Sequence, residues 1–130
     1  MSNSIENLIK EELKCSCRGY NLDKLLQPRI LTILAKQKLH GYLIIQELEN
    51  RNLFQGEKAD RTGIYRTLSI LEEKGLVQFE WNLESTGPAR KTYKITEAGI
   101  ECLSNWIRTL EDYRKAINVI IEEARSTLKK

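Results

Sequence analysis

The chain has 130 residues, of which 41% are hydrophobic and 30% charged, with a formal net charge of +3 and a pI near 8.8. This length fits one domain with an appended helix, and the apolar content is sufficient for a buried core. The sequence has no apolar run of about 18 residues and begins without a signal-peptide pattern, which predicts a cytoplasmic protein that does not enter a membrane. The mild positive charge suits a nucleic-acid partner without requiring one.

The first segment, residues 1–20, is predicted to be a helical extension that precedes the main domain. Ser4 is a suitable N-cap, and the segment is expected to end in a turn over Cys15–Gly19. Between them, apolar residues recur at helical spacing, namely Ile5, Leu8, Ile9 and Leu13.

Three further helices are predicted up to residue 75. The first covers residues 28–38, and the second starts after residues 40–42. The third begins after an N-cap at Asp60 or Thr62 and ends at Gly75, a residue type favoured just beyond a helix. Its predicted buried face consists of Ile64, Leu68, Ile70 and Leu71.

Two strands follow the third helix. Apolar and polar residues alternate from residue 76 to 83, and a second alternating segment runs from Lys91 to Thr96 after a loop over residues 85–89. Helices followed by a hairpin are the order of a winged helix-turn-helix, which we assign to residues 21–98. The predicted fold class is therefore mostly α with a small β-hairpin (α+β).

A long last helix is predicted to begin at Thr96 or Glu97, and we assign residues 99–130 to dimerisation. Its apolar residues follow a four-three spacing that Arg114 interrupts, and a stripe of this length exceeds what one small domain can cover. A second copy of the chain is the simplest partner. The predicted dimerisation residues are Leu103, Ile107, Leu110, Ile117, Ile121 and Leu128.

Candidate DNA contacts lie on the third helix, in the hairpin and at the start of the second helix. Small and polar residues at the start of a recognition helix allow close approach to the major groove, and cations in a hairpin wing can meet the minor groove. A helix N-terminus after His40 would offer amides to a phosphate, to which Tyr42 could add its hydroxyl. An ordinary solvated helix face and a basic hairpin remain the alternative interpretations. The candidates are Tyr42, Arg61, Thr62, Tyr65, Arg66, Arg90, Lys91 and Lys94.

The sequence does not indicate an enzyme or a cofactor. It contains no nucleophile–base constellation and no glycine-rich phosphate loop. Cys15, Cys17 and Cys102 could bind a soft metal or act as a redox switch, but the Cys-X-Cys spacing is not that of a zinc knuckle. Reduced cytosolic thiols are the favoured interpretation.

Several segments together resemble the PadR family of bacterial and archaeal transcriptional regulators, over residues 25–128. They are Ile30–Leu34, Leu39–Tyr42, Gly63–Leu68, Leu71–Val77 and Gly87–Gly99. The resemblance implies a homodimer that represses a nearby operon until a small molecule or stress signal releases it. It also implies DNA contacts by Tyr42, Tyr65, Arg66, Arg90 and Lys91, and it makes Trp106 and Tyr113 candidates for an effector pocket, although both could equally be packed interface residues.

Two alternatives remain open at this point. Acidic residues around the third helix (Glu57, Asp60, Glu72, Glu73) are compatible with a winged-helix module that binds protein instead of DNA. A regulator that senses metal or thiol state through its three cysteines is the other. The predicted partners are thus double-stranded DNA, a second copy of the chain and a small-molecule effector, with no membrane.

Overall fold

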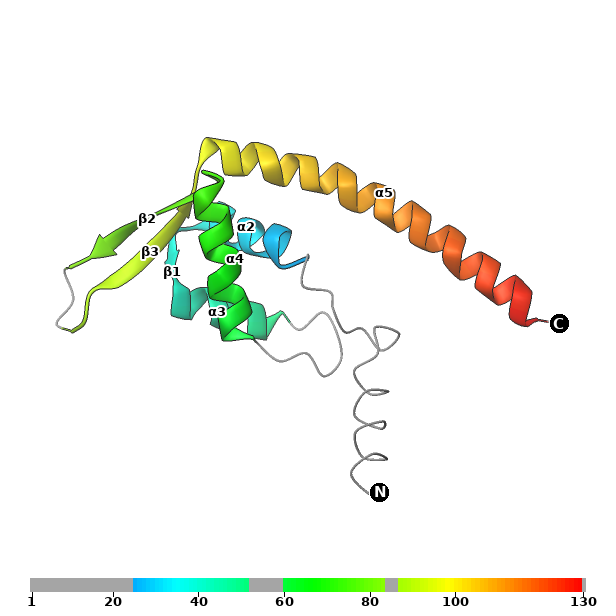
Figure 1. The fold of residues 1–130 in the computed structure, drawn as a ribbon, viewed down its shortest axis with the longest axis horizontal. Helices are drawn as coiled ribbons and strands as arrows, with labels where there is room; N and C mark the ends of the chain where they lie inside the picture. Colours follow the sequence, from blue (N-terminus) through cyan, green and yellow to red (C-terminus); the bar gives the residue numbers. More distant parts are fainter. Residues whose placement is uncertain (1–24, 52–59, 84–86, 130) are drawn as a thin grey trace, which may run out of the picture.

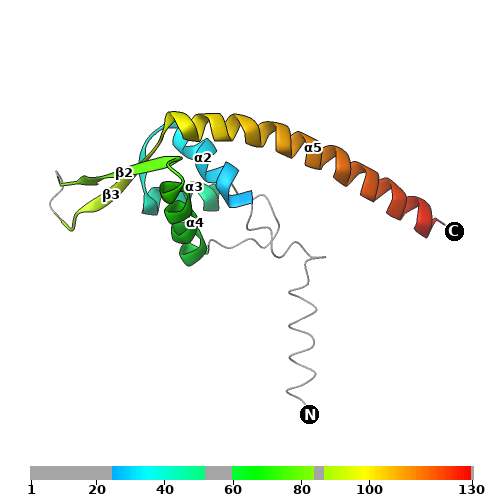
Figure 2. The ribbon, with the colours of Figure 1, turned by 45° about the horizontal axis from the view of Figure 1, so that its top comes forward.

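A computed structural model describes residues 25–51, 60–83 and 87–129. The described elements are α2 (Leu26–Lys36), β1 (Leu39–His40), α3 (Gly41–Asn50), α4 (Arg61–Glu73), β2 (Val77–Asn82), β3 (Arg90–Ile95) and α5 (Glu97–Leu128). The predicted order of helices, hairpin and long last helix is confirmed, and the predicted N-terminal extension lies outside the described residues. Helices α2, α3 and α4 and the sheet form a body, and α5 crosses this body and then extends well beyond it (Figures 1 and 2).

The core of the body lies where α2, α3 and α4 meet one another and the base of the sheet. Helix α4 contributes the inward positions expected from its periodicity, with Ile70 only partly covered. The core residues are Ile30, Leu31, Ile33, Leu34, Ile44, Ile45, Leu48, Ile64, Leu68, Leu71, Val77 and Tyr93.

The sheet is antiparallel with the strand order β1-β3-β2, so it has one more strand than the sequence predicts. Strand β1 pairs Leu39 with Tyr93 and His40 with Thr92. Two residues are too few to show an alternating pattern, and β1 forms through its pairing with β3 and not through a local preference. We call β2, β3 and their connection the wing.

Helix α2 begins two residues before Pro28, which still leaves the proline in the first turn, where a backbone donor has no intrahelical acceptor. Helix α4 begins after Asp60, the first of the two predicted caps, although the Asp60 side chain makes no capping hydrogen bond. Gly75 follows α4 with a φ of 73°, a conformation that glycine adopts without steric cost. The amides of Gly75 and Leu76 then donate to the carbonyls of Glu72 and Leu71, the pairing that closes a Schellman motif.

Thr96 joins the end of α4 to the start of α5. Its backbone amide donates to the Leu76 carbonyl at 3.1 Å, and its hydroxyl donates to the Gly75 carbonyl at 2.7 Å. The same hydroxyl accepts from the Gly99 amide at 3.0 Å and so caps α5. A side chain at Gly99 would overlap the Leu76 carbonyl oxygen, so the close approach of α5 requires glycine. We call this cluster of Gly75, Leu76, Thr96 and Gly99 the joint.

Helix α5 has 32 residues and changes its surroundings along its length. Its first turns pack on the body, where Cys102, Leu103 and Trp106 contact the core. Every residue from 111 to 129 is exposed. We call residues 111–128 the arm. Within the described residues, no helix combines the length and apolar character that crossing a bilayer requires.

Candidate nucleic-acid interface

Helix α4 presents one polar, exposed face along its length. Ile64, Leu68 and Leu71 are buried on the opposite side, which fixes the rotation of the helix. The exposed face carries both arginines in the first half of α4, whereas Glu72 and Glu73 stand at its end. Neither arginine has an ion-pair partner within the described part of the chain, so their charge is not locally neutralised. The exposed face consists of Arg61, Thr62, Tyr65, Arg66 and Ser69.

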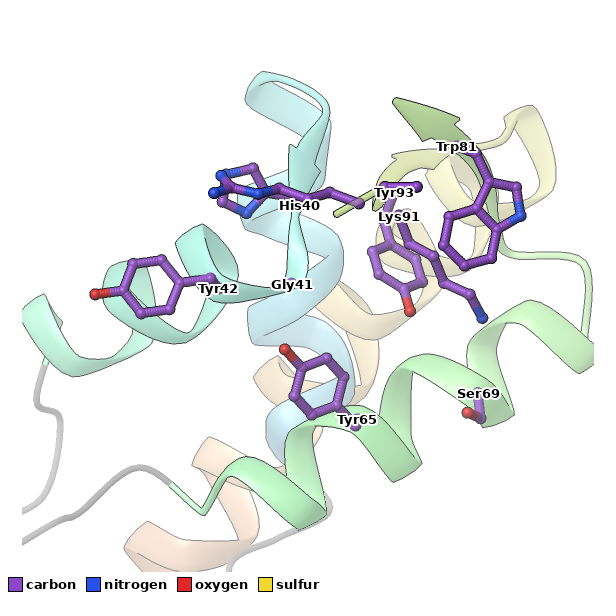
Figure 3. Close-up of a pocket in the computed structure, with 10 residues that line it drawn as sticks. His40, Gly41, Tyr42, Tyr65, Ser69, Trp81, Lys91 and Tyr93 are labelled. Carbon is purple, nitrogen blue, oxygen red and sulfur yellow. The ribbon is translucent and has the colours of Figure 1, made fainter. Parts of the chain in front are cut away.

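Tyr65 holds α4 against the start of α3. The ring reaches from α4 towards Gly41 (Figure 3), and a β-carbon at Gly41 would lie 2.7 Å from Tyr65 Cε1 and 3.0 Å from its hydroxyl oxygen. The missing side chain at residue 41 therefore provides the space in which the ring packs. Tyr65 remains partly exposed, which leaves it available to a ligand as well as to this packing.

The start of α3 brings a second aromatic side chain to the same region. His40 and Tyr42 are stacked, with ring centroids 6.4 Å apart, and Gln46 donates a hydrogen bond of 3.0 Å to the Tyr42 hydroxyl. No side chain caps α3, and its first turn holds no acidic residue. Among the described residues, no capping side chain accepts from its first backbone amides, which suits an anion.

The cations of the wing do not form one group. The odd-numbered residues of β3 face the core side of the sheet, as buried Tyr93 does, and Lys94 faces the other side. Arg90, at the start of β3, lies with Lys91 in the lining of the hollow between the wing and α4. The ammonium of Lys91 lies 4.2 Å from the ring centroid of Phe79 and 5.6 Å from that of Trp81. Lys91 is therefore held by aromatic rings, whereas Arg90 and Lys94 are exposed.

These elements surround an open hollow of about 700 Å³. Figure 3 shows Trp81 and Lys91 on the wing, Tyr65 and Ser69 on α4, and residues 40–42 at the start of α3 around it. Tyr93 lines its floor, and burial raises the pKa of the Tyr93 phenol, with further contributions from the negative charge of Glu72 and from Tyr65. The floor is therefore neutral at physiological pH, and the positive charge comes from the rim.

Comparison with known proteins identifies the class of this molecule. The family model described as the transcriptional regulator PadR-like family matches residues 30–105. The chain belongs to the PadR-like family. It is 30% identical over 84 residues to the negative transcriptional regulator PadR of Bacillus subtilis, which covers 65% of this chain and 46% of that protein. The family resemblance of the sequence is thereby confirmed.

Solved structures of PadR proteins share the fold. A PadR family transcription regulator of Clostridium difficile has a TM-score of 0.63 at 26% identity, covering 74% of this chain and 97% of that one. Bacillus subtilis PadR, crystallised with operator DNA, has a TM-score of 0.56 at 30% identity, covering 64% of this chain and 47% of that one. The present chain thus spans less than half the length of Bacillus subtilis PadR.

The predicted dimerisation residues of this PadR-like chain occupy two different environments. Leu103 packs against the core of its own body, and Leu110 is half-buried. The others are exposed, namely Ile107, Ile117, Ile121 and Leu128. Of the two candidate effector residues, Trp106 also packs against the core, whereas Tyr113, seven positions further along α5, is exposed.

The predicted metal or thiol site is described only in part. Cys102 is a free, half-buried thiol beside the core, and Cys15 and Cys17 lie outside the described residues. Among the residues that the structure describes, no group of three or more His, Cys, Asp or Glu side chains could hold a metal ion.

Three residues around the hollow were not predicted as site residues from the sequence, namely Ser69, His40 and Trp81. Ser69 follows Tyr65 by four positions, so its place on the exposed face of α4 was available from periodicity. The alternation of β2 correctly places Trp81 on the same face as Val77 and Phe79. It does not reveal that the strand extends past the core, which leaves the Trp81 side chain 55% exposed.

Proposed function

We propose that the protein is a DNA-binding transcriptional repressor that acts as a homodimer on a two-fold symmetric operator and is released by a small molecule. The polar face of α4 carries this proposal. It combines Arg61 and Arg66, which have no ion-pair partner among the described residues, with the hydroxyls of Thr62, Tyr65 and Ser69. The opposite side of the helix is fixed in the core. Arginine can bind guanine with two hydrogen bonds in the major groove, and hydroxyls bind phosphate.

The surroundings of α4 support the same ligand. The wing brings Arg90 and Lys91 to one side of the helix, and the uncapped start of α3 stands on the other. A recognition helix between two phosphate-binding elements suits a duplex, whose backbones flank the major groove. The related Bacillus subtilis PadR was crystallised with operator DNA.

The arm supports the homodimer. Ile117 and Ile121 are exposed on the part of α5 that extends beyond the body (Figure 1), and the apolar stripe continues to Leu128. Two such stripes would bury each other in a symmetric pair, because a two-fold axis brings the same surface of each copy together. The two α4 helices would then reach half-sites separated by one helical turn of DNA or a multiple of it.

Repression and release are the remaining parts of the proposal. The name of the Bacillus subtilis relative, a negative transcriptional regulator, supports repression. Trp106 and Tyr113 lie one heptad apart on the same side of α5, Trp106 where the helix packs on the body and Tyr113 in the first turn of the arm. An effector bound there would change the angle between the two copies, and with it the spacing of the α4 helices and the affinity for DNA.

The test is a fluorescence-anisotropy titration of the duplex upstream of the protein's own gene, over a series of salt concentrations and with random duplex as competitor. We expect tight, competitor-resistant binding that weakens steeply with salt, because lysine and arginine release counterions from DNA. Arg66→Ala and Arg90→Ala should each weaken binding about tenfold, which corresponds to roughly 1.4 kcal/mol. Arg108→Ala on the exposed side of α5 removes the same charge away from the interface and should leave the affinity within about twofold, as expected for a screened surface charge.

Two outcomes would overturn the assignment. Equal effects of the three substitutions would mean that net charge, and not this face, determines binding. Binding without salt dependence, or none to any duplex, would favour a protein partner for the winged helix.

A further inference from the structure

The inner face of the wing carries an exposed indole that the core does not account for. Trp81 is 55% exposed, although it lies on the same side of β2 as buried Val77 and half-buried Phe79. A large aromatic ring that remains in water at a polar surface is a frequent feature of binding sites, since its burial by a ligand is favourable.

Lys91 is positioned beside this indole by the sheet itself. The two residues are direct partners in the β2–β3 register, and Phe79 on the neighbouring pair supplies a second ring. An ammonium held over two rings has lost part of its side-chain freedom before any ligand arrives, so less entropy is lost when it binds an anion. No carboxylate within the described residues forms an ion pair with Lys91, so its charge remains available.

The opposite wall of the hollow is polar. Ser69 and Tyr65 lie one turn apart on α4 and line the hollow opposite the wing, with the Tyr65 ring directed towards Gly41, and the Lys91 ammonium extends towards α4 (Figure 3). One wall therefore offers an apolar ring beside a cation, and the other offers hydroxyls. A sugar–phosphate backbone has the matching chemistry, because each anionic phosphate is followed by a deoxyribose with apolar C–H faces.

We infer that the hollow between α4 and the wing binds the sugar–phosphate backbone of one DNA strand, with Trp81 packed on a deoxyribose and Lys91 bound to the adjacent phosphate. This inference rests on the proposed function. It adds a contact with the DNA backbone that does not depend on base sequence. Phosphate and sugar contacts fix the register of a protein on a duplex, whereas base edges determine which sequence is preferred. Trp81 and Lys91 thus position the duplex for α4.

Trp81 would act through an apolar contact and Lys91 through its charge. A series of salt concentrations distinguishes the two contributions. Trp81→Ala should weaken binding to the operator and to a random duplex by the same factor, about tenfold, with an unchanged slope of log affinity against log salt. Lys91→Gln should also weaken binding to both duplexes, and it should reduce that slope by about 0.9, the value for one lost phosphate contact. Val119→Ala, which truncates an equally exposed apolar residue on the arm, should change neither quantity.

Tryptophan fluorescence provides an independent measurement. The chain has two tryptophans, and Trp106 packs against the core whereas Trp81 is exposed. Duplex DNA should protect the wild-type emission from acrylamide, and this protection should be absent in Trp81→Phe, which reports on Trp106. Trp81→Phe should bind DNA within about threefold of wild type, because a phenyl ring retains most of the apolar contact.

The outcomes distinguish this inference from the proposed function. If wild-type protein binds no duplex, both fail. If wild type binds DNA but Trp81→Ala binds equally well, or if DNA leaves the Trp81 emission open to acrylamide, the backbone site is wrong and the regulator assignment stands. A Trp81→Ala effect confined to the operator would also overturn the inference, because a sugar contact is shared by all sequences.

Discussion

The body and the arm use the same apolar side chains at the same helical spacing, and they differ in what covers them. Ile64 on α4 is 1% exposed, and Ile117 on the arm is 52% exposed. Both belong to stripes that recur every three or four residues. The comparison teaches that helical periodicity identifies a face to be buried but not the molecule that buries it. The body covers its stripes with its own elements, whereas no element among the described residues covers the arm.

The largest effect is expected in the body. Leu68 on α4 is fully buried in the core. Leu68→Ala therefore leaves a cavity and should lower the free energy of unfolding by about 3 kcal/mol. Val119→Ala on the arm should change it by less than about 0.5 kcal/mol, because the side chain is already in water. Urea denaturation at one protein concentration measures both. A comparable loss in the two variants would mean that the arm is as buried as the body.

The next largest effect is expected on self-association, which should differ between substitutions on the two sides of the arm. Ile117 and Val119 are similarly exposed but lie about 200° apart around the helix, since each residue advances the helix by about 100°. Ile117→Glu places a charge in the proposed dimer stripe and should weaken self-association at least about 100-fold, or roughly 2.7 kcal/mol. Val119→Glu adds the same charge outside the stripe and should leave the dimer intact. Sedimentation velocity over a concentration series decides, and equal behaviour of the variants would exclude this stripe as the interface.

A smaller effect is expected at the joint between the two regions. Gly99→Ala forces the Leu76 carbonyl and the start of α5 apart, which should cost about 1–3 kcal/mol, as overpacking does elsewhere. Gly87→Ala is the matched control, because its added methyl group meets no atom within 4 Å. Thermal unfolding of both variants tests the difference. If Gly99→Ala does not destabilise the protein, α5 can shift without loss of stability. The joint would then not fix the direction of α5.

The smallest effect is a pH dependence confined to the body. Burial raises the pKa of Tyr93 above its ordinary value of 10.0. The negative charge of Glu72 and the neighbouring Tyr65 raise this pKa further. Folding therefore favours the protonated phenol, and the unfolded chain releases this proton first as the pH rises. The stabilisation is complete below pH 10 and declines above it. Tyr93→Phe should reduce the slope of unfolding free energy against pH between 9.5 and 11.5, and an unchanged slope would contradict the assignment.

Sequence patterns predicted the body well because its signals are local. The stripe of α4 and the glycine after it follow from helix geometry and from the conformation that ends a helix. Strand β1 was missed because two residues pair through a distant strand. The separation of Lys94 from Lys91 was also missed, although alternation along β3 contains it: Lys94 is three residues from Lys91 and therefore faces the other way.

The arm shows a different limit. The four-three spacing extends from Leu103 to Leu128 with one interruption, so Leu103 was predicted to contact a partner, whereas the structure places it against its own core. Where a stripe passes from one environment to another depends on how far the body extends along the helix. The exposure of Trp81 depends on the same kind of boundary, here between a strand and the end of the core. Neither boundary is visible in the spacing of residues.

The joint makes α5 a lever. Two hydrogen bonds of Thr96 attach it to the loop that closes α4, and a third, from the Gly99 amide, attaches it to the first turn of the 32-residue helix. At about 1.5 Å per residue the far end of α5 lies roughly 48 Å away, so a tilt of about 5° at the joint moves that end by about 4 Å. The same relation between tilt and displacement applies in the opposite direction. A displacement of several ångströms between two arms would rotate α5 at the joint, and so against α4, by only a few degrees. The length of α5 therefore converts large movements at the end of the arm into small changes of angle at the joint.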